Sequence, residues 1–280
     1  MSLPVCFSIA GSDPSGGAGI QADLKTFSAL GCYASAAPSV ITVQNTLGVT
    51  DVVPLPADLV YRQAEAVCTD LRPAALKIGM VGTAATVEAL CRLIDTHKPP
   101  FVVLDPILVS SSGRLLLPPD AAEAMTADLF PRCTLVTPNL PEMQAIHTLL
   151  QGHPAPAVGT AADIRSPQTA IAQAQALVRS GKARQVLLKG GHLATDASDH
   201  LVTAAGVLRY PAPRLAARAT HGTGCTLSSA IAAYVAKGHP LPEAIAAAKD
   251  YLTGALRQAD ALGAGSGRGS LHHFHNLYPA

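Results

Sequence analysis

The chain has 280 residues, of which 49% are hydrophobic, and its 20 Lys and Arg residues nearly balance its 19 Asp and Glu residues. This balance, with no run of basic residues that could follow a phosphate backbone, argues against nucleic acid as a partner. No apolar run is long enough to cross a bilayer, and residues 1–10 lack the features of a signal peptide. We therefore predict a cytoplasmic protein with no membrane partner.

We predict a single domain over residues 1–280, because α/β folds of this length often form around one sheet and no linker or internal repeat interrupts the chain. Only 4% of the residues are aromatic and Trp is absent, so Ala, Val, Leu and Ile must form the core. The six cysteines lack the close spacing of a zinc site or a redox dithiol. We expect most of them to be reduced thiols that fill core space.

Short apolar runs alternate with Ala-rich stretches along the chain. The runs show no polar alternation and end in Gly, Pro, Asp or Asn, which is the pattern of strands covered by helices on both faces. Crossovers through the intervening helices would make the strands parallel. We predict an α/β fold, a three-layer α/β/α sandwich with a mostly parallel sheet, and strands at residues 5–10, 39–43, 76–80, 101–106, 135–139 and 186–191.

Ligands of such sheets bind beyond the carboxyl ends of the strands. The first strand leads there into a Gly-rich loop, residues 11–19 (GSDPSGGAG). Its glycine spacing matches a P-loop, but Gly17-Ala18 stands where that motif requires Lys and then Ser or Thr. Residues 17–22 also fit a loose dinucleotide fingerprint, yet the second strand ends in Gln44-Asn45 and offers no acidic residue for a ribose. The loop therefore predicts neither a P-loop nor a nicotinamide site.

Gln44 and Met80 follow the next two predicted strands. The amide of Gln44 carries both donors and an acceptor, so it can pair with the edge of an aminopyrimidine. Met80 can form a soft wall against a flat ring. Each residue also has a simpler interpretation, because Gln is common at protein surfaces and Met is common as core filler.

Four residues at or just after strand ends match the needs of phosphoryl transfer, which uses metal-linked carboxylates, a cation near the transferred group and donors for the spreading charge. Each also has a structural alternative, such as capping a turn or a helix, or being solvated. Their occurrence at one sheet edge favours a common site. These residues are Asp105, Asn139, Glu142 and Lys189.

Residues 151–167 are rich in Pro, Gly and Ala and break the alternation of strands and helices. Long loops of this kind are either functional or simple surface excursions. From the sequence, a mobile flap and an excursion without function stay open as alternatives.

The segment from Thr220 to Thr226 (THGTGCT) leads into a predicted helix, LSSAIAAYVAKG, that Gly238 would end. A Gly-rich turn at a helix N-terminus offers free N–H groups and a dipole that favour an anion. The alternative is that these glycines only make a tight turn. We predict a phosphate-binding turn formed by Gly222, Thr223, Gly224 and Cys225.

Motifs over nearly the whole chain resemble, in order, those of the hydroxymethylpyrimidine/phosphomethylpyrimidine kinases of the ribokinase superfamily. The resemblance implies a ribokinase-like fold, usually dimeric. It also implies phosphorylation by Mg-ATP of 4-amino-5-hydroxymethyl-2-methylpyrimidine, and then of its monophosphate, for thiamine synthesis. The matching segments are residues 10–31, 44–49, 77–80, 137–142, 188–192, 220–228 and 272–274.

The resemblance also implies a substrate pocket, in which Gln44 would hold the pyrimidine and Gly11, Met80 and Ile107 would line the walls. The residue after the Gly-rich turn is an Asp general base in the wider superfamily. The pyrimidine kinases and this chain have a Cys there, so the role of Cys225 as a base or a bystander stays open.

By the same resemblance, Asp105 and Glu142 would serve Mg²⁺ and the phosphates. Lys189, with Asn139 and Thr223, would contact ATP. Three histidines near the C-terminus could suggest a metal site, but the tail motif of the family already accounts for two of them. These histidines are His272, His273 and His275.

Three other functions compete with this interpretation. A pyridoxal or pyridoxine kinase is the nearest, since it phosphorylates a hydroxymethyl group on a similar flat ring, although Gln44 favours an aminopyrimidine. A non-catalytic pyrimidine-binding protein would not need the Lys, Asp, Glu and Gly-rich elements. An oxidoreductase would need a nicotinamide site, which the first loop does not support.

Overall fold

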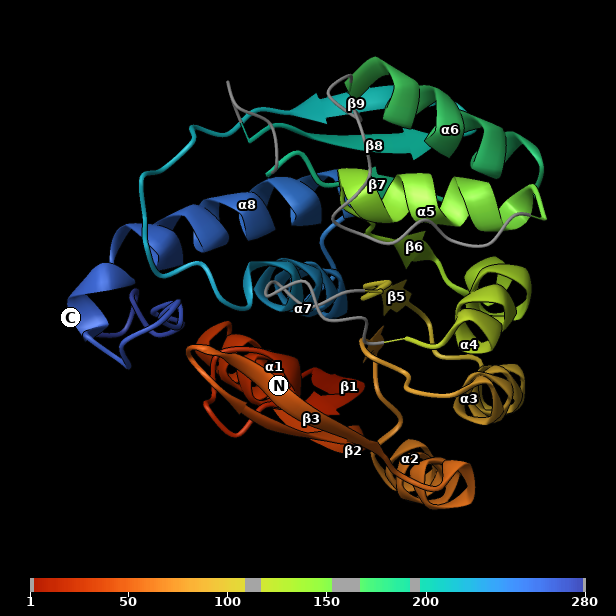
Figure 1. Ribbon diagram of the computed structural model, residues 1–280, viewed down its shortest axis with the longest axis horizontal. Coiled ribbons are helices and arrows are strands. Elements are labelled where there is room, and N and C mark those ends of the chain that lie inside the picture. The colour runs from red at the N-terminus through yellow and green to blue at the C-terminus, as the bar shows by residue number, and fades with distance from the viewer. Residues whose placement is uncertain (1–2, 109–116, 153–166, 192–196, 279–280) are drawn as a thin grey trace.

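The computed structural model describes residues 3–108, 117–152, 167–191 and 197–278. Within these residues, nine strands form one sheet in the order β3-β2-β1-β4-β5-β6-β7-β8-β9 (Figure 1). Six neighbouring strands are parallel and overlap the six predicted ones, which confirms the mostly parallel sheet. They are β2 (Tyr33–Asn45), β1 (Val5–Ser12), β4 (Ala75–Ile78), β5 (Val102–Leu104), β6 (Leu135–Val136) and β7 (Val186–Leu188).

Three antiparallel strands at the two edges of the sheet were not predicted. β3 (Gly48–Pro54) pairs with β2, whereas β8 (Asp199–Thr203) pairs with β7 and β9 (Gly206–Tyr210) pairs with β8. β3 and β9 are largely exposed, so neither carries the continuous apolar run that indicated the inner strands. The backbone of a neighbouring strand, rather than an apolar sequence, determines where these edge strands form.

Helices cover both faces of the sheet, which confirms the predicted three-layer sandwich (Figure 1). Strand residues alternate between the faces: Leu76 and Ile78 contact one helical layer, and Ala75 contacts the other. The first layer contains α2 (Ala57–Leu71), α3 (Ala84–His97), α4 (Pro119–Ala124), α5 (Leu140–Leu150) and α6 (Pro167–Arg179). The second contains α1 (Gly19–Ala29), α7 (Thr223–Ala236) and α8 (Leu241–Arg257). A π-helical turn (Met125–Leu129) and two 3₁₀ turns (Phe130–Arg132, Asp260–Leu262) complete the helical elements.

The structure also bears on the predictions for the cysteines, for the helix after the Gly-rich turn and for residues 151–167. All six cysteines are buried and free, as expected for thiols in the core. The predicted helix after the Gly-rich turn is α7, and Gly238 follows its end with a φ of +92°. None of the described helices is long and apolar enough to cross a bilayer. The possible flap at residues 151–167 falls mainly on residues 153–166, which lie outside the described part of the chain.

Candidate active site

A pocket of about 1180 Å³ lies where the loops after the parallel strands meet the N-terminus of α7. This volume exceeds the 300–1,000 Å³ typical of one small-molecule site, so two ligands can bind side by side. All of the candidate residues line this one pocket. They are Gly11, Gln44, Met80, Asp105, Ile107, Asn139, Glu142, Lys189, Gly222, Thr223, Gly224 and Cys225.

The predicted phosphate-binding turn, residues 222–225, begins α7 and is called the anion-binding turn below. Gly222 is the N-cap, with a φ of +83°, and an added Cβ would lie 1.8 Å from the Gly17 carbonyl oxygen, so only glycine fits. No side chain caps this helix end. The first N–H groups of a helix have no partner within the helix. They are therefore available to an anion in the pocket, where the helix dipole adds to the attraction.

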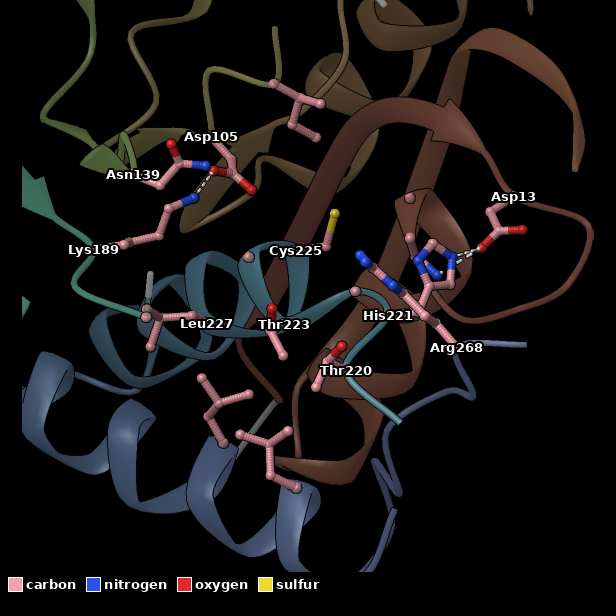
Figure 2. A pocket seen from close by; sticks show the side chains of 18 of the residues that line it. Asp13, Asp105, Asn139, Lys189, Thr220, His221, Thr223, Cys225, Leu227 and Arg268 are labelled. Atoms are coloured by element: carbon pink, nitrogen blue, oxygen red, sulfur yellow. Dashed lines mark hydrogen bonds and ion pairs between the residues drawn. The ribbon is translucent and has the colours of Figure 1, made fainter. Parts of the chain in front are cut away.

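Asp105, Glu142 and Lys189 form a charged cluster against this turn. Figure 2 shows Asp105 and Lys189 of this cluster. The Lys189 Nζ lies 2.5 Å from Asp105 Oδ1 and 3.8 Å from Glu142 Oε2. Thr137 donates its hydroxyl hydrogen to the same Asp105 oxygen, at 3.2 Å. A Cβ added to Gly224 would lie 3.0 Å from Asp105 Oδ2 and 3.2 Å from Lys189 Nζ. The backbone of the turn at Gly224 therefore lies directly against the Asp105 and Lys189 side chains.

The charges of this cluster depend on one another. Although burial opposes its charge, Asp105 and Glu142 raise the pKa of Lys189 above its usual range, so the amine is a cation at neutral pH. Burial raises the pKa of Glu142 to about 7, and Asp105 adds to this shift while Lys189 opposes it. A single lysine therefore does not fully compensate two buried carboxylates, and a further cation would favour the ionised form of Glu142.

Asn139 and Glu142 begin α5 as a reciprocal capping box. The Asn139 side chain accepts from the Glu142 amide at 2.9 Å, and Glu142 Oε2 accepts from the Asn139 amide at 2.7 Å. Asn139 thus has the capping role that was its structural alternative. The same bonds hold the Glu142 carboxylate at the pocket, 3.8 Å from Lys189.

Gln44 is held by residues that the sequence analysis did not single out. Its side-chain amide lies 3.0 Å from Thr42 Oγ1 and 3.1 Å from His221 Nε2. The same His221 nitrogen lies 2.7 Å from Asp13 Oδ2 (Figure 2). Since a carboxylate accepts hydrogen bonds, this nitrogen carries the proton and donates to Asp13. It therefore cannot accept from the Gln44 amide nitrogen, and the hydrogen bond that orients the Gln44 amide is the one from the Thr42 hydroxyl to its oxygen. Although burial opposes it, hydrogen bonds from His221 and Ser15 hold the pKa of Asp13 below its usual value.

The contact of Asp13 with His221 joins the first Gly-rich loop to the anion-binding turn. A Cβ added to Gly17 would lie 2.4 Å from the His221 ring, which shows how closely the loop packs against the turn. Asp13 and His221 each belong to a motif named from the sequence, but they lie 208 positions apart in the chain. A single sequence carries no signal that pairs them, so this contact could not be predicted.

The tail histidines stabilise the C-terminal segment. His273 is buried, its Nε2 lies 3.0 Å from Thr226 Oγ1, and its carbonyl oxygen accepts from the Tyr251 hydroxyl at 2.6 Å. Burial, with the nearby charge of Lys25, lowers the pKa of His273 to about 3, so the ring is neutral. Within the described residues, no three His, Cys, Asp or Glu side chains converge as metal ligands.

Cys225 is 6% exposed, and burial raises the pKa of its thiol to about 11, with Lys77 opposing the shift. The thiol is therefore protonated at neutral pH and unsuited to act as a base. We predict that Cys225→Ala lowers kcat by less than about tenfold, below the 10²–10⁴-fold contribution of a general base. Steady-state kinetics between pH 6 and 9 check this, with Cys225→Ser as the control. A loss of about 10²-fold or more that Cys225→Asp restores would assign proton abstraction to this position.

The α/β/α sandwich, the uncapped glycine turn and the lysine–carboxylate cluster together define a phosphotransferase, a ribokinase-like small-molecule kinase. The sequence model of the phosphomethylpyrimidine kinase family matches residues 13–272, so the chain belongs to this family. This membership argues against the oxidoreductase and the non-catalytic binding protein considered from the sequence.

Relatives and solved structures agree with this assignment. The chain is 47% identical to the hydroxymethylpyrimidine/phosphomethylpyrimidine kinase of Rhizobium meliloti over 98% of both chains. It is 42% identical to the Escherichia coli enzyme of that name over 95% of this chain and 96% of that one. The crystal structure of phosphomethylpyrimidine kinase from Clostridium difficile has a TM-score of 0.74 and 37% identity, covering 89% of this chain and 98% of that one. The ADP complex of Bacillus subtilis pyridoxal kinase has a TM-score of 0.84 and 31% identity, covering 99% and 100%.

Proposed function

We propose that this chain phosphorylates 4-amino-5-hydroxymethyl-2-methylpyrimidine and then its monophosphate, using ATP and Mg²⁺, in thiamine synthesis. The observation that carries the proposal is the shared pocket of Gln44, the anion-binding turn and Lys189. One end of the pocket offers an oriented amide for a heterocycle, and the other offers donors and charges for a phosphoryl group. The names of the curated relatives support this choice of substrate.

The pyrimidine would bind beside Gln44, whose amide oxygen already accepts from the Thr42 hydroxyl and whose amide nitrogen contacts His221. A held amide loses little rotational freedom on binding, which favours recognition of the amino group and ring nitrogen. Met80 lies over Gly11, since a Cβ added to Gly11 would be 3.4 Å from its sulfur. With Ile107, these residues supply apolar walls for a flat ring.

ATP would place its γ-phosphate at residues 222–225, against their amides and Lys189. These donors would stabilise the charge that spreads over the transferred phosphoryl group. Thr223 lies at the first position of α7, and Asn139, which forms a backbone bridge with Lys189, also lines the pocket. We assign both residues to the ATP site.

Asp105 and Glu142 fit a Mg²⁺ site, because Mg²⁺ in kinases is held by one or two carboxylates together with substrate phosphates. The raised pKa of Glu142 supports this assignment, since a cation there would favour the ionised carboxylate. When bound, the metal would neutralise charge on the phosphates of ATP. The protein residues would hold the two reactants in line, and a protonated Cys225 would contact the substrate without removing a proton.

Pyridoxal kinase activity is the second candidate. The observation in its favour is the TM-score of 0.84 with the Bacillus subtilis pyridoxal kinase, which is higher than the 0.74 with the phosphomethylpyrimidine kinase structure. Sequence identity favours the first candidate instead, since it is 37% with the phosphomethylpyrimidine kinase structure and 31% with the pyridoxal kinase. Gln44 also favours an aminopyrimidine over a pyridine that carries a phenolic oxygen.

The test is mass spectrometry of the products formed from the free alcohol and Mg-ATP, with ADP release measured in parallel. We expect the monophosphate first and the diphosphate later. Pyridoxal is assayed beside it, and a higher kcat/KM for pyridoxal would replace the proposed function by the second candidate. Binding of the alcohol without ADP formation would reject both kinase assignments.

We also propose that residues 1–280 act as one kinase domain in a cytoplasmic homodimer. The six free cysteines suit a reducing compartment. Support for the dimer comes from one face of the β2–β3 ribbon, where Ile41, Val43 and Val53 are 40%, 56% and 50% exposed. Ile41 and Val53 are cross-strand partners and Val43 lies two residues from Ile41, so these residues form a small apolar surface beside Asp51 that is suited to a second copy of the chain.

A further inference from the structure

In the C-terminal segment 263–269 (GAGSGRG), Gly267 and Arg268 line the pocket, and Arg268 is the only charged residue of the segment. The Arg268 amide donates to the Thr46 carbonyl oxygen at 2.9 Å, and the Gly267 amide donates to Thr46 Oγ1 at 3.2 Å. On the other side, the His221 amide donates to the Gly269 carbonyl oxygen at 3.2 Å. The backbone of Arg268 is thus held between the loop that follows Gln44 and the anion-binding turn.

Glycines make this close approach possible. A Cβ added to Gly267 would lie 2.1 Å from the Thr46 carbonyl oxygen, and one added to Gly265, which has a φ of +78°, would lie 2.4 Å from Thr46 Oγ1. Gly265 and Gly267 therefore pack directly against Thr46 in the β2–β3 turn. In Figure 2 the side chain of Arg268 points into the pocket, toward the anion-binding turn.

The two proposed substrates, the alcohol and its monophosphate, differ at the end that would face the anion-binding turn. The alcohol is neutral there, whereas the monophosphate carries close to two negative charges at neutral pH. In the second transfer this group must lie beside the γ-phosphate of ATP, so the substrate side of the pocket needs positive charge. The pocket-lining Lys189 and Lys249 pair with Asp105 and Asp199. Arg214 lines the pocket near Gly191, whose carbonyl oxygen it contacts at 3.0 Å, whereas Arg268 lies beside the loop that follows Gln44. An arginine can bind a phosphate through two parallel N–H donors.

We propose that Arg268 binds the phosphate of the monophosphate substrate and is a specificity-determining residue for the second phosphorylation; this inference rests on the proposed function. In that step a phosphate oxygen of the monophosphate attacks the γ-phosphorus of ATP. The new P–O–P bond forms as the bond from that phosphorus to the β,γ-bridging oxygen breaks, and ADP leaves. The nucleophile is already an anion and needs no base, which agrees with a protonated Cys225.

The experiment compares kcat/KM for the alcohol and for the monophosphate, assayed separately, in wild type and Arg268→Gln. We expect a loss of about 10- to 100-fold for the monophosphate, the size expected for a charge-assisted bidentate contact, and a change below about threefold for the alcohol. Arg268→Lys should recover part of the loss. Arg257→Gln, an exposed residue at the end of α8 that does not line the pocket, is the matched control.

Equal losses for both substrates, or no loss for either, would overturn the role of Arg268. So would a wild-type protein that phosphorylates the alcohol but never the monophosphate, although the first half of the proposed function would then stand. A wild-type protein that releases no ADP with either substrate would reject the proposed function and this role together. Because Arg268 is exposed, its variants should fold, and equal melting temperatures check this.

Discussion

Gly224→Val is expected to abolish turnover while the protein still folds. A Cβ at this position would already lie 3.0 Å from Asp105 Oδ2 and 3.2 Å from Lys189 Nζ, and the two further methyl groups of Val would enter the space proposed for the γ-phosphate. Misplacing one donor of the developing charge costs about 10²–10³-fold in kcat. Because the substitution also blocks the reacting group and displaces Lys189, we expect a loss of about 10³-fold or more.

Gly224→Val should leave the fold intact, because the backbone at this position accepts a side chain. Gly224 is not among the glycines with a positive φ, so an L-residue fits its backbone. Valine is also a slightly better helix former than glycine. Circular dichroism and a melting curve check the fold, and Ala236→Val at the other end of α7 is the control for added side-chain bulk. Gly224→Ala should give an intermediate rate. A kcat near the wild-type value in the Val variant would reject the anion-binding turn.

Lys189→Met should give the second large effect, a loss of about 10³-fold in kcat/KM, because it removes the cation beside the transferred phosphoryl group. The variant also leaves Asp105 and Glu142 buried without their partner. In the wild-type protein, Lys189 opposes the rise in the pKa of Glu142. Without Lys189, the pKa of Glu142 should therefore rise further above about 7. A protonated Glu142 cannot serve a metal ion, and higher pH should then restore part of the activity.

A comparison with Lys249 separates catalysis from stability in this experiment. Lys249 lies 2.6 Å from Asp199, in a pair as buried as that of Lys189 and Asp105. Breaking either pair by removing the lysine should cost about 3–5 kcal/mol of unfolding free energy. Chemical denaturation should thus show similar losses for Lys189→Met and Lys249→Met. If kcat/KM also fell equally in the two variants, Lys189 would have no special part in phosphoryl transfer.

The candidate site was largely accessible from the sequence because its groups stand at the ends of apolar runs. Asp105 and Lys189 follow β5 and β7, and parallel strands direct their carboxyl ends to one edge of the sheet. The contact of Lys189 with Asp105 therefore follows from topology. Asn139 illustrates a sequence alternative that proved correct, since it caps α5 whatever else it contacts.

Other parts of the site depend on contacts between distant segments. Gln44 lies near the end of β2, Asp13 in the loop after β1 and His221 just before α7, and only the folded chain brings these three residues into contact. Arg268 was overlooked for a related reason: a single charge in a glycine-rich tail has no pattern of its own. Its position depends on the Thr46 backbone, more than 200 residues earlier in the chain.

The sequence by itself determined the inner parallel strands, the helix that follows the glycine turn and the chemical types of the site residues. These follow from local rules, namely apolar runs, glycine at strained turns and free amides at a helix start. Only the tertiary structure decided where β3, β8 and β9 pair, how Gln44 is held and why Cys225 stays protonated. Those properties arise from burial and from contacts across the sheet, which local sequence does not encode.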